Sequence, residues 1–285
     1  MTREYRLRTR KLKRPSGRSG TQPVVVAVCG SFNPVHKTHL ALYAAAKARL
    51  GEKNEAVEYE VLGGFLSPVS DAYGKPGLAP LATRLEILDL ALADHPELDV
   101  DEWEGLQETY TRTAIVLGHL EDALNEWQKN LFPSEAVCSP ETTRLPIRVV
   151  FACGADLFES FLRPGCWPIA LLKKLLDRHL LVVVGRPGFG NDVEELAKRA
   201  MADGRTVLHE EKDGVVQELD LSRYKFQFTV FPKEDATSST SIRALATQLS
   251  HATTPPQRQR EARVQLEAMV PAVVADIVIK YYGSE

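Results

Sequence analysis

Two histidines stand three residues apart, directly after a predicted buried strand and a tight turn. Residues 24–29 form a continuous apolar run with several β-branched side chains, which predicts a strand covered on both faces. Gly-Ser-Phe-Asn-Pro follows at 30–34, and the Ala- and Leu-rich residues 38–50 predict a helix. A helix start presents unpaired backbone N–H groups and the positive end of a dipole, and His36 and His39 lie on one face of its first turn. We therefore expect both imidazoles to donate hydrogen bonds to one anion, such as a phosphate group.

The His-x-x-His spacing also occurs in zinc sites, so a metal is the competing interpretation of these histidines. No third ligand stands at a metal-binding spacing, and the start of a helix favours anions over cations. We therefore expect no metal ion bound directly by the protein.

A second group of polar side chains marks the start of a later helix. Ser238, Ser239 and Thr240 precede Arg243 by about one helical turn. Ser and Thr often act there only as helix caps, which is the simpler interpretation of this group alone. The planar fork of an arginine, however, also matches phosphate oxygens. Together with the histidines, this group predicts a second anion site, suited to the distal phosphates of a triphosphate.

Three further residues carry both a binding and a structural interpretation. Trp103 and Trp167 are expected on loops at one edge of the sheet, where an indole stacks on a flat heterocycle and attracts a cationic ring. Both indoles could instead pack in the core. Asp156, two residues after Gly154, can accept a hydrogen bond from a ribose hydroxyl or cap its own helix. The two roles of Asp156 are compatible.

Strand–loop–helix units repeat along the chain. Apolar runs predict strands at 58–66, 98–100, 147–153, 180–185, 206–208 and 228–231, and periodic segments predict helices at 80–93, 109–127, 155–162, 168–177, 193–201, 239–249 and from Pro271 onward. This alternation predicts an α/β fold, a Rossmann-like doubly wound parallel sheet with helices on both faces. Such sheets bind ligands at the carboxyl ends of the strands, where the strand order reverses. The turns at Gly30, Gly154 and Gly185 lie at such ends.

Composition indicates an ordinary globular chain with one unusual end. The 285 residues are 44% hydrophobic and carry a net charge of −3, which gives no general bias toward nucleic acid. Residues 1–20 nevertheless hold eight Lys or Arg against one Glu. We expect a flexible basic tail at 1–22 and a single domain at 23–285 that ends in helices.

The cysteines and the absence of sorting signals bear on location. Four cysteines show no regular spacing, and we see neither a secretory signal nor a long apolar span. We expect a reducing intracellular compartment, the cytoplasm, with the nucleus left open by the basic residues at 11–14. There is also no Gly-x-Gly-x-x-Gly after a strand and no Walker A sequence, which disfavours dinucleotide oxidoreductases and P-loop NTPases.

The segment Gly-Ser-Phe-Asn-Pro-x-His-x-x-His resembles the signature of the nucleotidyltransferase superfamily. Further segments resemble one family in it, the eukaryotic-type nicotinamide/nicotinic acid mononucleotide adenylyltransferases: Ser-Pro-Val-Ser-Asp-Ala-Tyr at 67–73, Trp103-Glu104, Cys-Gly-Ala-Asp-Leu at 153–157, Trp167 and Ser238-Ser239-Thr240 with Arg243. The resemblance runs from Val24 to the C-terminus, except for parts of 130–146 and of 205–228, a charged hairpin-like insertion without an assigned role. Some members have Lys at Gly63 and Asn at Asp235, so contacts there do not carry over.

The resemblance implies a nucleotidyltransferase-type fold and adenylyl transfer from ATP to nicotinamide or nicotinic acid mononucleotide by direct in-line attack. It implies catalytic roles for His36, His39 and Arg243. It implies ATP contacts at Gly30, Ser31, Phe32, His39, Gly154, Asp156, Ser238, Ser239, Thr240 and Arg243. It implies mononucleotide contacts at Ser31, Phe32, Gly64, Trp103, Leu106, Trp167 and Arg186. Mg²⁺ would be bound through the ATP phosphates, and homo-oligomers are common in the family.

Two other functions remain open at this point. One is transfer to a different small acceptor, as in pantetheine-phosphate adenylyltransferases or cytidylyltransferases, against which the two tryptophans speak. The other is a non-catalytic nucleotide-binding or chaperone protein whose basic tail contacts RNA or a partner. Intact His36, His39 and Arg243 disfavour a loss of catalysis.

Overall fold

The structure is a computed structural model. It describes residues 4–52, 57–133, 144–163, 165–185, 195, 198, 202–204, 206–212, 215–231, 237–251 and 255–283.

A parallel sheet of six strands forms the centre of the described part of the chain. Its strands are β1 (Thr21–Gly30), β2 (Glu58–Pro68), β3 (Leu98–Val100), β4 (Arg148–Gly154), β5 (Leu180–Gly185) and β8 (Phe226–Val230). The strands lie in the order β3-β2-β1-β4-β5-β8, and each pair of neighbours is parallel. The chain first moves outward from β1 through β2 to β3, and then returns to the other side of β1. The order therefore reverses between β1 and β4, as the doubly wound prediction requires.

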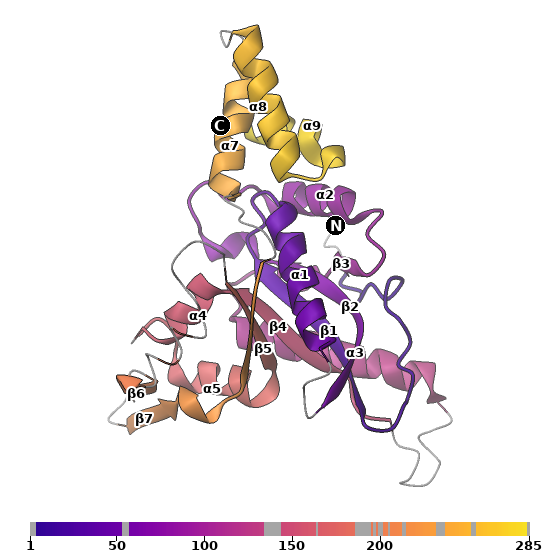
Figure 1. The fold of residues 1–285 in the computed structure, drawn as a ribbon, viewed down its shortest axis with the longest axis vertical. Helices are drawn as coiled ribbons and strands as arrows, with labels where there is room; N and C mark the ends of the chain where they lie inside the picture. Colours follow the sequence, from indigo (N-terminus) through magenta and orange to yellow (C-terminus); the bar gives the residue numbers. More distant parts are fainter. Residues whose placement is uncertain are drawn as a thin grey trace.

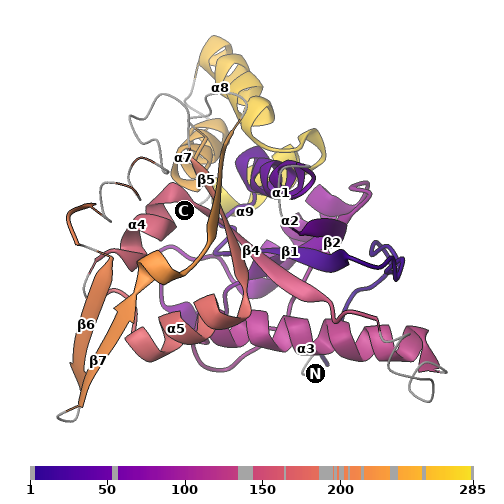
Figure 2. The ribbon, with the colours of Figure 1, turned by 60° about the horizontal axis from the view of Figure 1, so that its bottom comes forward.

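Helices cover both faces of this sheet (Figure 1). One face carries α1 (Lys37–Leu50), α2 (Leu81–Leu92), α7 (Ser239–Ser250), α8 (Pro256–Met269) and α9 (Ala275–Tyr282). The other face carries α3 (Thr113–Leu131), α4 (Ala155–Phe161) and α5 (Ile169–Arg178). In Figure 2, α3 and α5 run below the sheet, with α1 and α2 above it.

Alternate residues of β1 supply the two cores. Val24, Val26 and Val28 are buried against the face with α1, whereas Val25 and Ala27 are buried against the face with α3. A strand that is covered on both faces therefore needs an uninterrupted apolar run, because its side chains alternate between them. The short 3₁₀ turns η1 (Asp71–Tyr73), η4 (Leu221–Arg223) and η5 (Ala272–Val274) complete the described elements.

The predicted strands and helices agree well with the observed ones, with two differences. Of the strand expected at 206–208, residues 207–208 belong to β6 (Val207–Lys212). This strand pairs antiparallel with β7 (Val215–Asp220) in a separate hairpin and not in the main sheet. Helix α8 was not expected from the sequence, because only Ala262 and Leu266 are buried along its polar length. The helix expected at 193–201 lies mostly outside the described residues.

The N-terminal residues differ most from expectation. Residues 4–20, here the N-terminal segment, lie against β2 and β3 instead of forming a flexible tail. The Lys13 backbone N–H donates to the Leu62 carbonyl oxygen at 2.9 Å, and the Lys13 ammonium pairs with Glu97 at 2.5 Å. Leu7 and Leu12 pack against the core beneath α3. The charges that predicted a solvated tail are thus partly matched by carboxylates of the domain.

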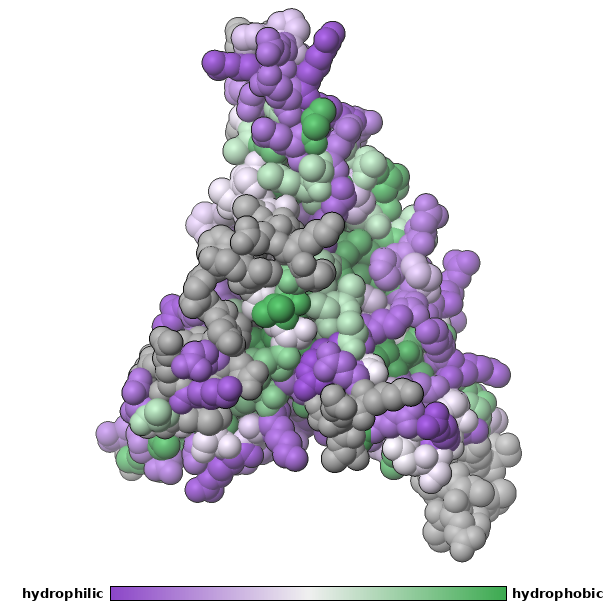
Figure 3. Space-filling view, viewed as in Figure 1, coloured by the Kyte–Doolittle hydropathy of each residue, from purple (hydrophilic) through white to green (hydrophobic). Residues whose placement is uncertain are grey.

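The surface is mostly polar at the edges of the molecule. In Figure 3, hydrophilic residues cover the free end of α8, and more hydrophobic residues lie over α1 in the middle of the view. Within the described ranges, none of the helices has the length and apolar composition needed to cross a lipid bilayer.

Candidate active site

The loop between β1 and α1 lies at the carboxyl end of the central strand. Gly30 is the last residue of β1, and its carbonyl oxygen accepts a hydrogen bond from the Val69 N–H at 3.0 Å. Phe32 has a φ of +44°, a region that bulky residues seldom occupy. Its ring is buried and meets His39 edge to face, with centroids 4.9 Å apart. Such backbone strain persists only where the surroundings hold it, which is typical of functional loops.

The two histidines stand together at the start of α1, as predicted. Their ring centroids are 3.7 Å apart. His36 is the N-cap residue of α1, and its backbone N–H donates to Nδ1 of His39 at 3.1 Å. Nδ1 of His39 is therefore an acceptor without a proton, so Nε2 is the nitrogen that donates. The His39 ring thus offers an N–H donor at a helix start.

Asn33 connects this loop to two distant parts of the chain, and only 1% of it is exposed. Its Nδ2 donates to the Gly77 carbonyl at 2.6 Å. Its Oδ1 accepts from the Ala79 N–H at 3.1 Å and from the Tyr282 hydroxyl at 2.8 Å. Because a buried amide is costly unless its hydrogen-bonding groups are satisfied, these partners fix the loop.

The start of α7 lies directly on the same loop. Arg243 donates from Nη1 to the Asn33 carbonyl oxygen at 2.8 Å, and the Ser239 hydroxyl donates to the Pro34 carbonyl oxygen at 3.0 Å. Ser238 caps the helix, since its Oγ accepts from the Ser241 N–H at 3.1 Å. Thr240 is exposed and lies 3.5 Å from Nη2 of Arg243. The histidine loop and the predicted second anion site are therefore one cluster, in which Ser238 serves mainly as the cap.

Gly154 and Asp156 lie at the carboxyl end of β4, the strand beside β1. Gly154 is the N-cap residue of α4, and a Cβ added there would stand 2.6 Å from Oδ1 of Asp156. Only glycine lets this carboxylate approach so closely. Asp156 is exposed in the first turn of α4, so its carboxylate is accessible to a ligand.

Trp103 follows β3 at the same edge of the sheet. Its indole stacks on the His119 ring, with centroids 4.0 Å apart and 11° between the planes. Burial lowers the pKa of His119, so this ring is neutral at pH 7. One face of Trp103 is thus backed by a flat, uncharged ring.

Three buried carboxyl groups, those of Asp101, Glu102 and Glu104, lie beside Trp103 in the chain. Two of them, Glu104 and Asp101, have raised pKa values. Burial raises the pKa of Glu104 to about 8, and the nearby Asp101 adds to this effect. Burial also raises the pKa of Asp101 to about 6. Glu104 is therefore mainly a neutral acid at pH 7, and a neutral carboxyl group can donate as well as accept a hydrogen bond.

Trp167 precedes α5 and is partly buried. Its Nε1 donates to the Ser160 hydroxyl at 2.9 Å, and its ring meets Phe161 edge to face at 4.9 Å. The structure thus gives Trp167 a fixed orientation on the α4–α5 connection.

For Gly64 and Leu106, two residues expected at the mononucleotide site, the structure shows local packing and backbone contacts. Gly64 lies within β2, where a Cβ would stand 2.4 Å from the Tyr43 ring, so its small size serves packing against α1. The Leu106 N–H donates to the Glu102 carbonyl oxygen at 3.1 Å, within the turn itself. Arg186 lies outside the described residues, as does Asp235. Ser31, by contrast, is in the histidine loop and partly exposed.

Arg84 is a residue of the site that sequence reasoning missed. Its side chain is fully buried and donates to three backbone carbonyl groups around the histidine loop. Nη1 donates to the Ser31 carbonyl at 3.1 Å, Nη2 donates to the Val69 carbonyl at 2.8 Å, and Nε donates to the Ala79 carbonyl at 2.8 Å. Nη2 also pairs with Asp71 at 2.9 Å. The available signal was an arginine on the apolar face of the predicted helix 80–93, three residues after Leu81.

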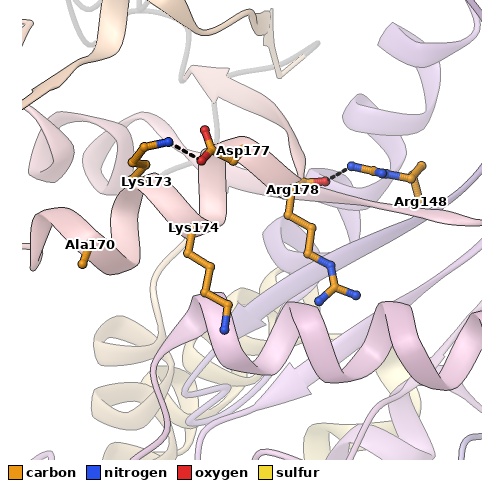
Figure 4. Close-up of a pocket in the computed structure, with 6 residues that line it drawn as sticks. All are labelled: Arg148, Ala170, Lys173, Lys174, Asp177 and Arg178. Carbon is orange, nitrogen blue, oxygen red and sulfur yellow. Dashed lines mark hydrogen bonds and ion pairs between the residues drawn. The ribbon is translucent and has the colours of Figure 1, made fainter.

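A hollow beside α5 lies away from this cluster (Figure 4). It is lined by Arg148, Ala170, Lys173, Lys174, Asp177 and Arg178. Lys173 pairs with Asp177, and Arg148 donates to the Arg178 carbonyl. Since Arg148 begins β4, this hollow is at the amino edge of the sheet, opposite the carboxyl ends.

The donors of the cluster suit phosphate rather than a metal ion. Imidazole N–H, guanidinium and helix-start N–H groups all donate to anions. Among the described residues, no group of three or more His, Cys, Asp or Glu side chains could hold a metal ion.

Comparison with known proteins agrees with this geometry. The model of the cytidylyltransferase-like family matches residues 27–245, which include the histidine loop and the start of α7. The chain belongs to this family. It is also similar to several named adenylyltransferases. A nicotinamide/nicotinic acid mononucleotide adenylyltransferase of Oryza sativa subsp. japonica is 31% identical over 215 residues, which cover 75% of this chain and 77% of that protein.

Two further relatives carry the same name. The nicotinamide/nicotinic acid mononucleotide adenylyltransferase 1 of Bos taurus is 32% identical over 195 residues, covering 60% of this chain and 67% of that protein. The corresponding protein 2 of Saccharomyces cerevisiae is 34% identical over 181 residues, covering 63% of this chain and 42% of that protein. The chain thus spans less than half the length of the yeast relatives that it matches. These relatives confirm the resemblance of the sequence motifs to the nicotinamide/nicotinic acid mononucleotide adenylyltransferases, and the chain belongs to this family.

Proposed function

We propose that this protein transfers the adenylyl group of ATP to nicotinamide or nicotinic acid mononucleotide, forming NAD or deamido-NAD and pyrophosphate. The observation that carries the proposal is the hydrogen bond from Arg243 to the Asn33 carbonyl, because it joins two phosphate-binding helix starts into one site. The names of the relatives supply the substrates.

Binding of ATP would use the donors at the reversal point of the sheet. The triphosphate would lie against His36, His39 and Arg243, where the starts of α1 and α7 add the positive ends of their dipoles. The ribose would reach Asp156, whose exposed carboxylate accepts from hydroxyl groups. Gly30, Ser31 and Phe32 would contribute backbone and side-chain contacts from the end of β1 and the loop that joins it to α1.

The mononucleotide would place its pyridine ring on Trp103, with Trp167 as the second aromatic group. An indole held by His119 is a rigid surface for a flat cationic ring. Its phosphate would reach Ser31 and Phe32, close to the triphosphate. Preference between the amide and the carboxylate forms is not fixed by these contacts, because both rings stack alike.

The reaction would be a direct displacement at phosphorus. An oxygen of the mononucleotide phosphate forms a bond to the α-phosphorus of ATP, the bond from that phosphorus to the bridging oxygen breaks, and pyrophosphate leaves with the bonding electrons. A phosphate dianion is already a competent nucleophile, so the protein positions the reactants and stabilises charge. Nε2 of His39 and the guanidinium of Arg243 would donate to the oxygens that gain negative charge.

Mg²⁺ fits this site only together with ATP. The donors here are cationic or neutral N–H groups, which would bind phosphate oxygens and leave the ion to the triphosphate. When bound, the ion would neutralise charge on the departing pyrophosphate. Cytoplasmic location and homo-oligomer formation stay predictions.

The test is pyrophosphate release from ATP and Mg²⁺ with three separate acceptors. We expect release with nicotinamide mononucleotide, nicotinic acid mononucleotide or both, and none with phosphopantetheine. Release only with phosphopantetheine would still agree with the nucleotidyltransferase superfamily, but it would contradict the proposed acceptor. Binding of ATP without release with any of the three would instead favour a non-catalytic nucleotide-binding protein.

A further inference from the structure

The N-terminal segment reaches the back of the Trp103 loop. The Tyr5 ring meets the His119 ring edge to face, with centroids 5.1 Å apart and 67° between the planes. The opposite partner of His119 is Trp103, stacked at 4.0 Å. Tyr5, His119 and Trp103 therefore form a continuous row of aromatic rings from the N-terminal segment to the loop after β3.

Charged side chains also connect the N-terminal segment to the Trp103 loop. The Asp101 carboxylate accepts from the Trp103 N–H at 3.4 Å. Burial raises the pKa of Tyr5, and the charge of Asp101 adds to this effect. Arg8 lies 3.8 Å from Glu102 and 3.4 Å from Asp99, and it also pairs with Asp89. The segment thus contacts the residues immediately before Trp103 as well as its ring partner.

The segment is itself fixed to the sheet behind these contacts. Lys11 donates to the Leu98 carbonyl at 3.1 Å. Leu12 lies against Gly63, where an added Cβ would stand 2.9 Å from the leucine side chain. Gly63 has a φ of +155°, a conformation that L side chains rarely adopt, so a residue with a side chain there would disturb both β2 and this contact.

We propose that residues 4–13 are part of the mononucleotide half of the active site, in which Tyr5 and Arg8 act as positioning residues that hold Trp103 in its stacking orientation. This inference rests on the proposed function, because it takes Trp103 as the surface for the pyridine ring. Neither residue needs to touch substrate. We therefore expect substitutions of Tyr5 or Arg8 to weaken binding of the mononucleotide, without a change in ATP binding or in the rate of adenylyl transfer.

The first experiment compares Tyr5→Ala with Tyr5→Phe in the full chain. Aromatic pairs contribute about 0.5–1.5 kcal/mol beyond their buried area, so Tyr5→Ala should raise KM for the mononucleotide about 2- to 12-fold. KM for ATP and kcat should stay within about twofold of the parent value. Tyr5→Phe keeps the ring against His119 and should restore most of the mononucleotide affinity. Arg14→Ala, an exposed residue of the same segment, is the matched control.

The outcomes separate this inference from the proposed function. If Trp103→Ala raises KM for the mononucleotide but Tyr5→Ala does not, the positioning role is overturned and the proposed function stands. If Trp103→Ala leaves that KM unchanged, the proposed place of the pyridine ring itself fails. A rise in both KM values with Tyr5→Ala would show that the segment only stabilises the fold. If Tyr5→Ala does not fold, Arg8→Ala serves instead and should raise KM for the mononucleotide while KM for ATP stays unchanged. Equal mononucleotide KM values for the parent and Arg8→Ala would then contradict the inference.

Discussion

Arg243 donates a hydrogen bond to the main-chain carbonyl of Asn33 at 2.8 Å, although 210 positions separate the two residues in the chain. The contact uses one nitrogen of the guanidinium and brings it onto the histidine loop. Because the fork of an arginine has further donors, this geometry orients the group while it keeps donors for phosphate. The contact with Asn33 is a structural role of Arg243, whereas its contact with phosphate is the proposed chemical role, and substitutions can separate the two.

Arg243→Ala should lower kcat for pyrophosphate release by about 10²–10³-fold, the usual effect of losing a donor to developing negative charge. Arg243→Lys keeps the charge but not the fork, and should recover only part of this loss. Steady-state kinetics with ATP and mononucleotide measure both. Arg258→Ala, on the exposed side of α8, is the control. Activity of Arg243→Ala within twofold of the parent would remove the arginine from the phosphate site.

His39→Ala should lower turnover by orders of magnitude with the fold intact. The variant loses the Nε2 donor, and it also loses the Nδ1 acceptor for the His36 N–H at the start of α1. Circular dichroism and the melting temperature check the fold, while pyrophosphate release measures the chemistry. A variant with near-normal turnover would mean that His39 does not contact the reacting phosphates.

Glu104→Gln should remove a pH dependence of stability. The folded protein keeps a proton on Glu104 up to a pKa of about 8, whereas the unfolded chain releases it near 4.5. The unfolded state therefore binds fewer protons within this window, and stability of the parent falls as pH rises, by about 1.4 kcal/mol per pH unit at most for one group. Urea denaturation from about pH 6.5 to 8, above the pKa of Asp101, measures the slope. An identical slope in the variant would show that Glu104 does not hold this proton.

Glu121→Gln should be destabilising at neutral pH and much less so in acid. Glu121 is 4% exposed, and its carboxylate accepts from Arg178 at 2.8 Å and from the Val149 N–H at 2.9 Å. Although burial opposes the shift, hydrogen bonds from His179, Arg178 and Val149 lower its pKa from 4.5 to about 2. This stabilisation, roughly 3 kcal/mol, is complete above about pH 4.5 and is lost as pH falls toward 2.

The measurement is the free energy of unfolding of parent and Glu121→Gln at pH 7 and near pH 3. We expect a wide difference at pH 7 that narrows in acid. A difference that is equal at both pH values would mean that the native state does not stabilise the ionised form of Glu121.

Much of the sheet, and the arrangement of the residues in the candidate site, followed from local patterns. The apolar run before Gly30, the histidine spacing and the cap at Ser238 each depend on neighbours within a few residues, so the sequence alone predicts them. The family resemblance then joined these local features into one site, and the contact between Arg243 and Asn33 agrees with it.

What sequence reasoning missed depends on contacts between distant segments. In the sequence, Arg84 is a single charged residue on the apolar face of a predicted helix. Its role follows only from the folded structure, in which three backbone carbonyl groups from outside that helix accept its hydrogen bonds. The N-terminal segment looks unstructured because its charges are matched by distant residues, such as Glu97 and Asp99, which lie more than 80 positions from their partners. The packing of Gly64 against Tyr43 also depends on a distant segment and was not foreseen, while its expected contact with the mononucleotide stays a prediction.

The hydrogen bond from Tyr282 to Asn33 determines when, during synthesis of the protein, the contacts of the histidine loop can be completed. The ribosome makes the histidine loop early, but 249 positions separate Asn33 from the hydroxyl that completes its contacts. At about 5–20 residues per second, this delay amounts to roughly 12–50 s. During this interval a nascent chain carries the histidine loop without the Tyr282 contact, so the buried Asn33 side chain obtains its full set of partners only after α9 has left the ribosome.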